Sequence, residues 1–253
     1  MRSVELLRDK VTDFKKYPFC IPAVRHLKSL ELHPKVTFFV GENGSGKSTL
    51  IEGIAVAAGF NAEGGSRSFK FATRRSESDL HQTLRLVRGT RRPKTGYFLR
   101  AESFFNVASN IEALDEDPWG GPPIIDSHGG RSLHEQSHGE SFLALVQHRF
   151  GSNGLFILDE PEAALSPQRQ LVLLRLIDEL VQKRGSQIIV ATHSPIVLAY
   201  PDAFIYSLDG PAGPVQTPYE ATEHFALTRD FLLNHHRYVG RLLAGEESPE
   251  KAT

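Results

Sequence analysis

Three short apolar runs stand out along the chain, each rich in β-branched and large side chains. They are Val36–Val40, Leu155–Leu158 and Gln187–Ala191. Uninterrupted apolar runs of this length favour strands buried on both faces, as in a parallel sheet. Helical patterns follow the first two runs, over residues 47–58 and 168–184, where Leu171, Leu174 and Val181 recur at about 3.6-residue spacing. This alternation predicts an α/β fold with a mostly parallel core sheet.

The stretch between the first two runs has a different character. Leu80–Arg88 has a β-like pattern, and a turn-rich segment then leads to Tyr97–Leu99, which together predict an antiparallel β arm. Residues 67–100 carry ten Lys and Arg against Glu77 and Asp79, a balance of +8, although the whole chain has a net charge of −1. Three interpretations remain open for this basic stretch: a solvated arm, a nucleic-acid surface, or a docking face for an acidic partner.

The remaining organisation favours one domain over residues 1–253, with a helical region at 101–150 and a C-terminal helical segment at 219–245. The single cysteine, Cys20, excludes an internal disulfide, and the charged N-terminal residues do not resemble a secretory signal. No apolar run approaches the roughly 18–20 residues that cross a bilayer. We therefore expect a soluble, cytoplasmic protein.

The segment directly after the first apolar run, Gly41-Glu-Asn-Gly-Ser-Gly-Lys-Ser48, fits the pattern G-x-x-x-x-G-K-[ST] between a strand and a helix. Glycines allow backbone N–H groups to converge on phosphate oxygens, and the helix N-terminus adds partial positive charge. Lys47 would reach the β- and γ-phosphates, and the Ser48 hydroxyl would bind Mg²⁺. The pattern predicts an ATP site formed by Gly41, Asn43, Gly44, Ser45, Gly46, Lys47, Ser48 and Thr49.

The second apolar run ends in Asp159-Glu160, which places two carboxylates at the carboxyl edge of the sheet, where open α/β folds bind ligands. Asp159 is a candidate ligand of Mg²⁺. Glu160 is a candidate for orienting or deprotonating an attacking water. An apolar run followed by two acids is common, but next to the phosphate-binding loop it favours ATP hydrolysis.

With these motifs in place, the chain resembles the ABC-type ATPases over nearly its whole length. Ser137-His-Gly-Glu140 is similar to the family signature in its S-x-G-E form, 159–166 is similar to Walker B with the D-loop, and His193 is similar to the switch histidine. The resemblance implies a homodimer that sandwiches two ATP molecules, with Ser137 and Gly139 facing the γ-phosphate held by the other subunit.

Spacing around the signature agrees with an anion-binding position. Phe142, Leu145 and Val146 follow helical spacing directly after Gly139, so Ser137 is expected near a helix N-terminus. His193 follows a buried strand, where an imidazole can hydrogen-bond a phosphate.

The sequence departs from the transporter pattern in three places. The signature is SHGE, Ser166 stands at the usual D-loop aspartate, and no glutamine marks the Q-loop. Glu102 or Arg100 would take that glutamine's place, and we expect Glu102 near Mg²⁺.

The S-x-G-E form is similar to the soluble branch with RecF-type, SMC and defence-system ATPases. Members of that branch with long coiled coils carry them between the phosphate-binding loop (Walker A, residues 41–48) and the signature, and this chain has no heptad repeat there. The sequence therefore most resembles the compact, stand-alone bacterial predicted ATPases. An ABC-transporter subunit and a nucleic-acid repair or phage-defence ATPase remain alternatives.

Two further features need interpretation. His134-Glu-Gln-Ser-His138 fits H-E-x-x-H, the pattern of zinc proteases, but the glycines at 129, 130 and 139 argue against the continuous helix which that chemistry needs. Tyr17 and Phe19 lie upstream of the phosphate-binding loop, where an aromatic ring could stack on adenine or pack in the core.

Overall fold

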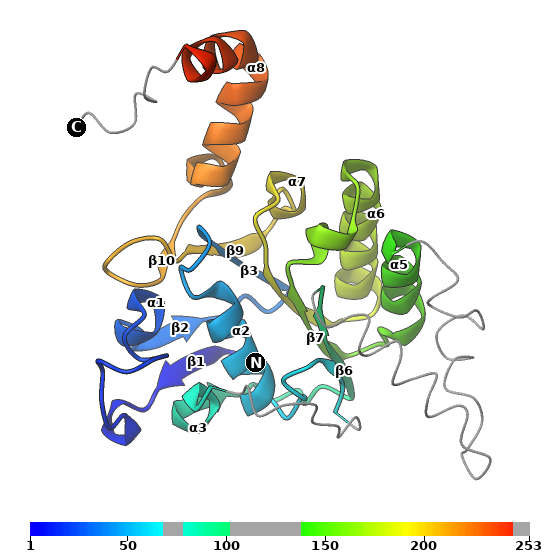
Figure 1. Cartoon of the computed structure of the whole chain (residues 1–253). Coiled ribbons are helices and arrows are strands. Elements are labelled where there is room, and N and C mark those ends of the chain that lie inside the picture. The colour runs from blue at the N-terminus through cyan, green and yellow to red at the C-terminus, as the bar shows by residue number, and fades with distance from the viewer. Residues whose placement is uncertain (68–77, 102–137, 245–253) are drawn as a thin grey trace, which may run out of the picture.

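A computed structural model describes residues 1–67, 78–101 and 138–244 of the chain (Figure 1). The strands are β1 Ser3–Leu6, β2 Ser29–Glu31, β3 Val36–Val40, β4 Gly65–Ser66, β5 Leu84–Val87, β6 Thr95–Arg100, β7 Gly154–Asp159, β8 Gln187–Ala191, β9 Ala203–Ser207 and β10 Val215–Gln216. The α-helices are α1 Pro22–Arg25, α2 Lys47–Ala57, α3 Leu80–Thr83, α5 His138–Arg149, α6 Pro167–Asp178, α7 Pro195–Leu198 and α8 Glu223–Leu243. Short 3-10 helices cover Arg8–Lys10, Pro161–Ala164 and Tyr219–Ala221, and a π-helix covers Glu179–Lys183.

The larger sheet has the described strand order β10-β9-β3-β8-β7-β6-β4. Strands β9, β3, β8, β7 and β6 run parallel, and β10 and β4 pair antiparallel at the two edges. The three apolar runs of the sequence form β3, most of β7 and β8, at the centre of this sheet. The expected α/β fold with a mostly parallel core sheet is therefore confirmed.

Alternation along β3 explains why this strand is apolar throughout. Val36, Phe38 and Val40 belong to one hydrophobic cluster, which includes buried side chains of α5 and α6. Phe39 belongs to a second cluster, with Leu50, Ile51 and Ile54 of α2. The two clusters cover opposite faces of the sheet, so each face of β3 is shielded from water.

Within residues 78–100, the described part of the basic stretch, the chain forms no single antiparallel arm. Residues 80–87 form helix α3 followed by β5, and β5 pairs antiparallel with β1 in a second sheet of order β2-β1-β5. Tyr97–Leu99 lies in β6, which pairs parallel with β7 in the main sheet. The turn-rich segment thus connects β5 of the smaller sheet with β6 of the main sheet. Burial of Tyr97, Phe98 and Leu99 in the core explains why this strand belongs to the main sheet.

The helix after β7 also differs in detail from the expectation. Helix α6 ends at Asp178, and the chain continues as a π-helix to Lys183. Its buried apolar side chains are Leu173 and Ile177, whereas Leu171 is 58% exposed. Of the predicted apolar face, Val181 is buried and Leu174 packs against the core, as expected. Leu171 does not, because it lies about 200° around the helix from the buried Leu173.

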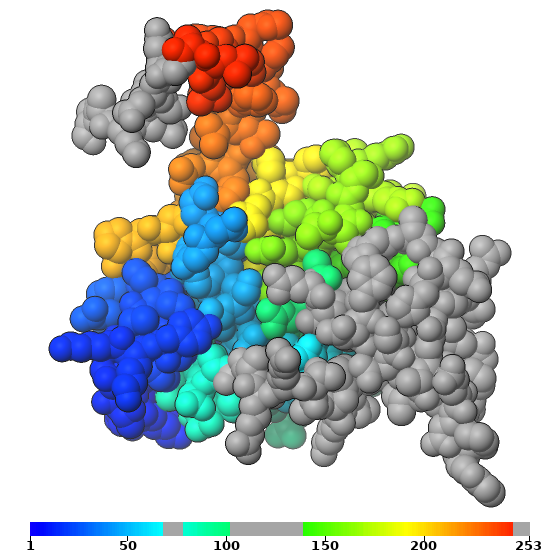
Figure 2. All heavy atoms as spheres, viewed as in Figure 1, coloured from blue at the N-terminus to red at the C-terminus, as the bar shows by residue number. Residues whose placement is uncertain are grey.

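Helix α8 projects away from the body of the molecule (Figures 1 and 2). None of its residues is buried, and the helix departs from helical geometry at Asn234. Within the described residues, no helix combines the length and apolarity that crossing a membrane requires.

Candidate functional site

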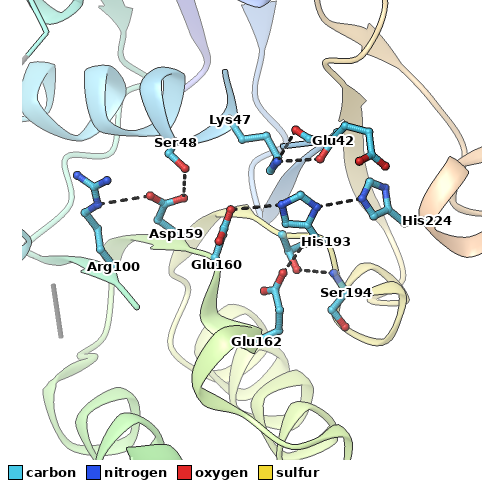
Figure 3. A network of polar contacts seen from close by, with 12 residues as sticks. Glu42, Lys47, Ser48, Arg100, Asp159, Glu160, Glu162, His193, Ser194 and His224 are labelled. Atoms are coloured by element: carbon cyan, nitrogen blue, oxygen red, sulfur yellow. Dashed lines mark hydrogen bonds and ion pairs between the residues drawn. The ribbon is translucent and has the colours of Figure 1, made fainter. Parts of the chain in front are cut away.

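The candidate site lies where the parallel strands end. The phosphate-binding loop follows β3. Asp159 is the last residue of β7, Glu160 comes directly after it, and His193 follows β8. Because β3, β7 and β8 are parallel neighbours, their carboxyl ends meet at one edge of the sheet. Figure 3 shows these side chains gathered in one network of polar contacts.

Backbone geometry explains two glycines of the phosphate-binding loop. Gly44 and Gly46 have φ angles of 85° and 98°, in the left-handed region where side chains are strained. At Gly46 a Cβ would also lie 2.7 Å from the Cγ2 of Ile21. The loop therefore turns directly into helix α2 in a conformation that only glycine adopts readily.

Lys47 begins helix α2 and is only 4% exposed. Its ammonium donates to the carbonyl oxygens of Gly41 at 2.7 Å and Glu42 at 3.0 Å. Burial lowers the pKa of Lys47, and the negative charges of Glu160 and Asp209 oppose that shift. The loop thus holds one cation at its centre, as a site for phosphate groups requires.

The two residues expected to bind Mg²⁺ lie together. Ser48 Oγ donates to Asp159 Oδ1 at 3.2 Å, and Asp159 is 5% exposed. A hydroxyl and a carboxylate are hard oxygen ligands, and protein Mg²⁺ sites commonly supply one or two such groups while phosphates and water supply the rest. The described residues contain no cluster of three His, Cys, Asp or Glu side chains that could hold a metal by themselves. The pair therefore fits Mg²⁺ bound together with a nucleotide.

Arg100, at the end of β6, lies against this pair. Its Nε is 3.4 Å from Asp159 Oδ2, and its Nη1 donates to Glu52 Oε2 of helix α2 at 2.7 Å. Arg100 therefore stands in the region where the sequence placed a substitute for the Q-loop glutamine. Glu102, the other candidate, lies outside the described residues.

Glu160 and His193 face each other across the site. Glu160 Oε1 is 3.3 Å from His193 Nε2, with a geometry short of a hydrogen bond. The backbone of Glu160 has a φ of 50°, a strained value for a residue with a side chain, and its N–H donates to Ala191 O of the neighbouring strand. The backbone N–H of His193 donates to Glu162 Oε1 at 2.5 Å. The strand ends thus hold a carboxylate and an imidazole beside Lys47.

Two site residues were missed by the sequence reasoning. Asp209 Oδ1 accepts from the Glu42 N–H at 2.5 Å, and His224 Nε2 lies 3.0 Å from His193 Nδ1. The position of Asp209 shortly after β9, at the same sheet edge, was a usable signal. His224 had none, because it belongs to helix α8, which only the tertiary structure brings to His193.

Helix α5 carries the described part of the signature. A Cβ on Gly139 would lie 2.8 Å from Ala164 O and 2.6 Å from Arg169 Nη1, so this glycine also permits close packing within the chain. Glu140 pairs with Arg169 at 2.8 Å. Ser137 lies outside the described residues, as do 134–137 of the H-E-x-x-H motif.

The two aromatic residues upstream of the phosphate-binding loop, Tyr17 and Phe19, differ in their exposure to solvent. Phe19 is buried in the hydrophobic cluster that includes helix α2. Tyr17 is 64% exposed, and its hydroxyl lies 3.2 Å from the Thr49 hydroxyl at the start of that helix. Of the two, Tyr17 is the aromatic residue available for contact with a base.

Two protein-family models match the chain. Residues 10–110, with the phosphate-binding loop, match a model described as "AAA domain". Residues 128–199, with Gly139, Asp159, Glu160 and His193, match one described as "AAA domain, putative AbiEii toxin, Type IV TA system". No curated protein matches the chain.

Of two solved structures that match this chain, the first supports a similar fold. It is described as "An inward-facing conformation of a putative metal-chelate type ABC transporter": it is 16% identical, has a TM-score of 0.51, and the match covers 89% of this chain and 86% of that one. The SMC head domain from Thermotoga maritima is also 16% identical, with a TM-score of 0.41 and coverages of 75% and 92%.

The parallel sheet order, the phosphate-binding loop and the structure with a TM-score of 0.51 define the fold of this chain as the α/β P-loop fold of ABC-type nucleotide-binding domains. The two AAA-domain models each match a part of the chain, and both parts contribute residues to the site described above.

Proposed function

We propose that this protein binds MgATP and hydrolyses it to ADP and phosphate. The observation that carries the proposal is the position of Glu160, which faces His193 at 3.3 Å beside Lys47 and the Ser48–Asp159 pair. Lys47 would bind the β- and γ-phosphates, and Ser48 and Asp159 would hold Mg²⁺, which offsets phosphate charge when bound. Glu160 would orient the attacking water and accept its proton, and His193 would contact the γ-phosphate.

Lys47→Ala tests the binding step. Loss of the ammonium removes a charge-assisted contact to the phosphates, so we expect the affinity for MgATP to fall by about 10- to 100-fold. Isothermal titration calorimetry measures this change. Lys35→Ala is the matched control, because Lys35 pairs with Asp202 away from the loop. Equal ATP affinity in Lys47→Ala and wild type would remove Lys47 from the site.

We further propose a cytoplasmic homodimer that sandwiches two ATP molecules. Support comes from the signature resemblance and from the placement of its helix: α5 packs beside α6, apart from α2 and the phosphate-binding loop (Figure 1). In this arrangement, Ser137 and Gly139 of one subunit complete the site formed by Lys47 and Glu160 of the other.

Mixing two inactive variants tests the shared site. Lys47→Ala and Ser137→Arg proteins, each without turnover alone, should form mixed dimers with one intact site. For statistical dimers with independent sites, ATP turnover should recover to about a quarter of the wild-type value. Ser137 is the better position for this test, since any side chain at Gly139 would meet Ala164 of its own chain. No recovery, with Glu160→Gln monomeric in ATP by size-exclusion chromatography, would exclude the sandwich.

A nucleic-acid-coupled process is the second candidate for the work that ATP drives. Arg91, Arg92 and Lys94 line a hollow of about 580 Å³, and Arg67, Arg88, Arg91 and Arg92 line an adjoining one of about 240 Å³. The described residues lining both hollows include no acid. Burial and the positive charge of Arg88 lower the pKa of Arg67. Concentrated positive charge of this kind favours a polyanion such as a phosphate backbone.

Salt dependence tests this surface. We expect wild type to bind DNA or RNA with an affinity that falls as salt rises, and replacement of Arg88, Arg91 and Arg92 by Gln to lower the salt slope by roughly one per lost phosphate contact. Fluorescence anisotropy at two salt concentrations measures it. Arg85→Gln is the control, since Arg85 already pairs with Glu5 in the smaller sheet. No binding by wild type at low salt would favour the solvated interpretation.

A further inference from the structure

His224 lies at the base of helix α8 and contacts the imidazole of His193. The rings meet through His193 Nδ1 and His224 Nε2, 3.0 Å apart (Figure 3). A hydrogen bond between two ring nitrogens needs one proton, so one ring donates and the other accepts. The other nitrogen of His193, Nε2, faces the Glu160 carboxylate at 3.3 Å.

Charge at Glu160 favours the tautomer of a neutral His193 that carries its proton on Nε2, without fixing it alone. An Nε2 lone pair would repel the carboxylate oxygen, whereas an Nε2–H attracts it. A neutral His193 with its proton on Nε2 has a lone pair on Nδ1. His224 must then be the donor, through Nε2–H.

The surroundings of His224 agree with that assignment. Burial lowers the pKa of His224, and a positive charge on His193 would lower it further, while Glu42 and Asp209 oppose the shift. A neutral His224 that donates from Nε2 keeps a lone pair on Nδ1. That Nδ1 is buried and has no hydrogen-bond partner among the described residues. A buried nitrogen without its proton is less costly there than an orphaned N–H donor.

Contacts at the base of α8 fix the position of His224. The Tyr219 hydroxyl donates to Pro195 O at 2.9 Å, two residues after His193. The Tyr219 ring packs on Phe225 with centroids 4.5 Å apart, and Thr222 is buried and donates to Tyr219 O. The base of α8 is therefore attached to the segment that carries His193, although the rest of the helix projects from the body (Figure 2).

From this geometry we propose that His224 is a positioning residue: it fixes His193 in the tautomer that carries its proton on Nε2, the nitrogen facing Glu160. The consequence for catalysis rests on the proposed hydrolysis at this site. With Nε2–H held in place, His193 presents a donor toward Glu160 and the γ-phosphate position, and it keeps that donor only while α8 stays docked at its base.

The test combines a tautomer measurement with kinetics. Nitrogen-15 NMR of the full chain with labelled histidine distinguishes protonated from unprotonated ring nitrogens, and a His193→Gln spectrum identifies the His193 signals. In wild type we expect Nε2–H alone. His224→Phe keeps a ring but removes the donor, so His193 should populate both tautomers. His224→Gln keeps an N–H donor and should restore the single tautomer.

Turnover should follow the tautomer. We expect kcat to fall about three- to tenfold in His224→Phe with the KM for ATP little changed, and to stay within about twofold of wild type in His224→Gln. His235→Phe, an exposed histidine on the same helix, is the control for changes in α8. A His224→Leu variant provides a second donor-free side chain if the Phe variant does not fold.

An Nδ1–H tautomer of His193 in wild type would overturn the proposal. Equal losses in His224→Phe and His224→Gln would also overturn it, because the lost donor could not then be the cause. If wild type shows no ATP turnover, the proposed function fails, while the NMR measurement still decides the role of His224.

Discussion

Replacing Glu160 by Gln is expected to lower ATP turnover by about 10²- to 10⁴-fold while MgATP still binds. The amide has nearly the same shape as the carboxylate, so contacts that depend on volume survive. It cannot accept a proton, and it presents a different hydrogen-bonding pattern to an attacking water. Phosphate release measures turnover, and calorimetry measures binding.

The backbone around Glu160 sharpens this expectation. Its φ of 50° and its N–H bond to Ala191 O fix the side chain at the end of β7, independently of the charge on the carboxylate. The matched control is Glu31→Gln, an exposed residue of the smaller sheet, which should keep wild-type turnover. Wild-type turnover in Glu160→Gln would assign the proton acceptor to another group.

Replacing Arg100 by Ala is expected to destabilise the protein by about 3–5 kcal/mol. The side chains of Arg100, Glu52 and Asp159 are 17%, 14% and 6% exposed, so removal of the cation leaves two shielded carboxylates without its charge. Urea denaturation measures the free energy of unfolding. Asp159 keeps its contact with Ser48, which places the expected loss toward the lower end of the range.

A surface ion pair provides the comparison for Arg100. Arg85 pairs with Glu5, and the Arg85 side chain is 62% exposed, so Arg85→Ala should cost only about 0–1 kcal/mol. Adding MgATP to the Arg100 variant should recover part of the lost stability, because the bound cation would face Asp159. A loss equal to that of Arg85→Ala would show that the Arg100 contacts do not offset buried charge.

Local sequence determined the parallel strands, the phosphate-binding loop and Asp159-Glu160. Each of these depends on neighbours in the chain: an apolar run buried on both faces, glycines at positive φ, and polar residues at a strand end. The parallel pairing of β3 with β8 and of β8 with β7 then brings Lys47, Glu160 and His193 to one edge. The sequence predicted that these residues lie at the same sheet edge, but it gave no distances between their side chains.

Tertiary structure alone decided the features that depend on partners far along the chain. β5 pairs with β1, about eighty residues away, which divides the expected arm between two sheets. Contacts with Glu52 and Asp159 position the Arg100 side chain. The hydrogen bond of Tyr219 to Pro195, next to α8, positions His224. No local periodicity encodes such contacts, because they arise only when burial of the core brings separate segments together.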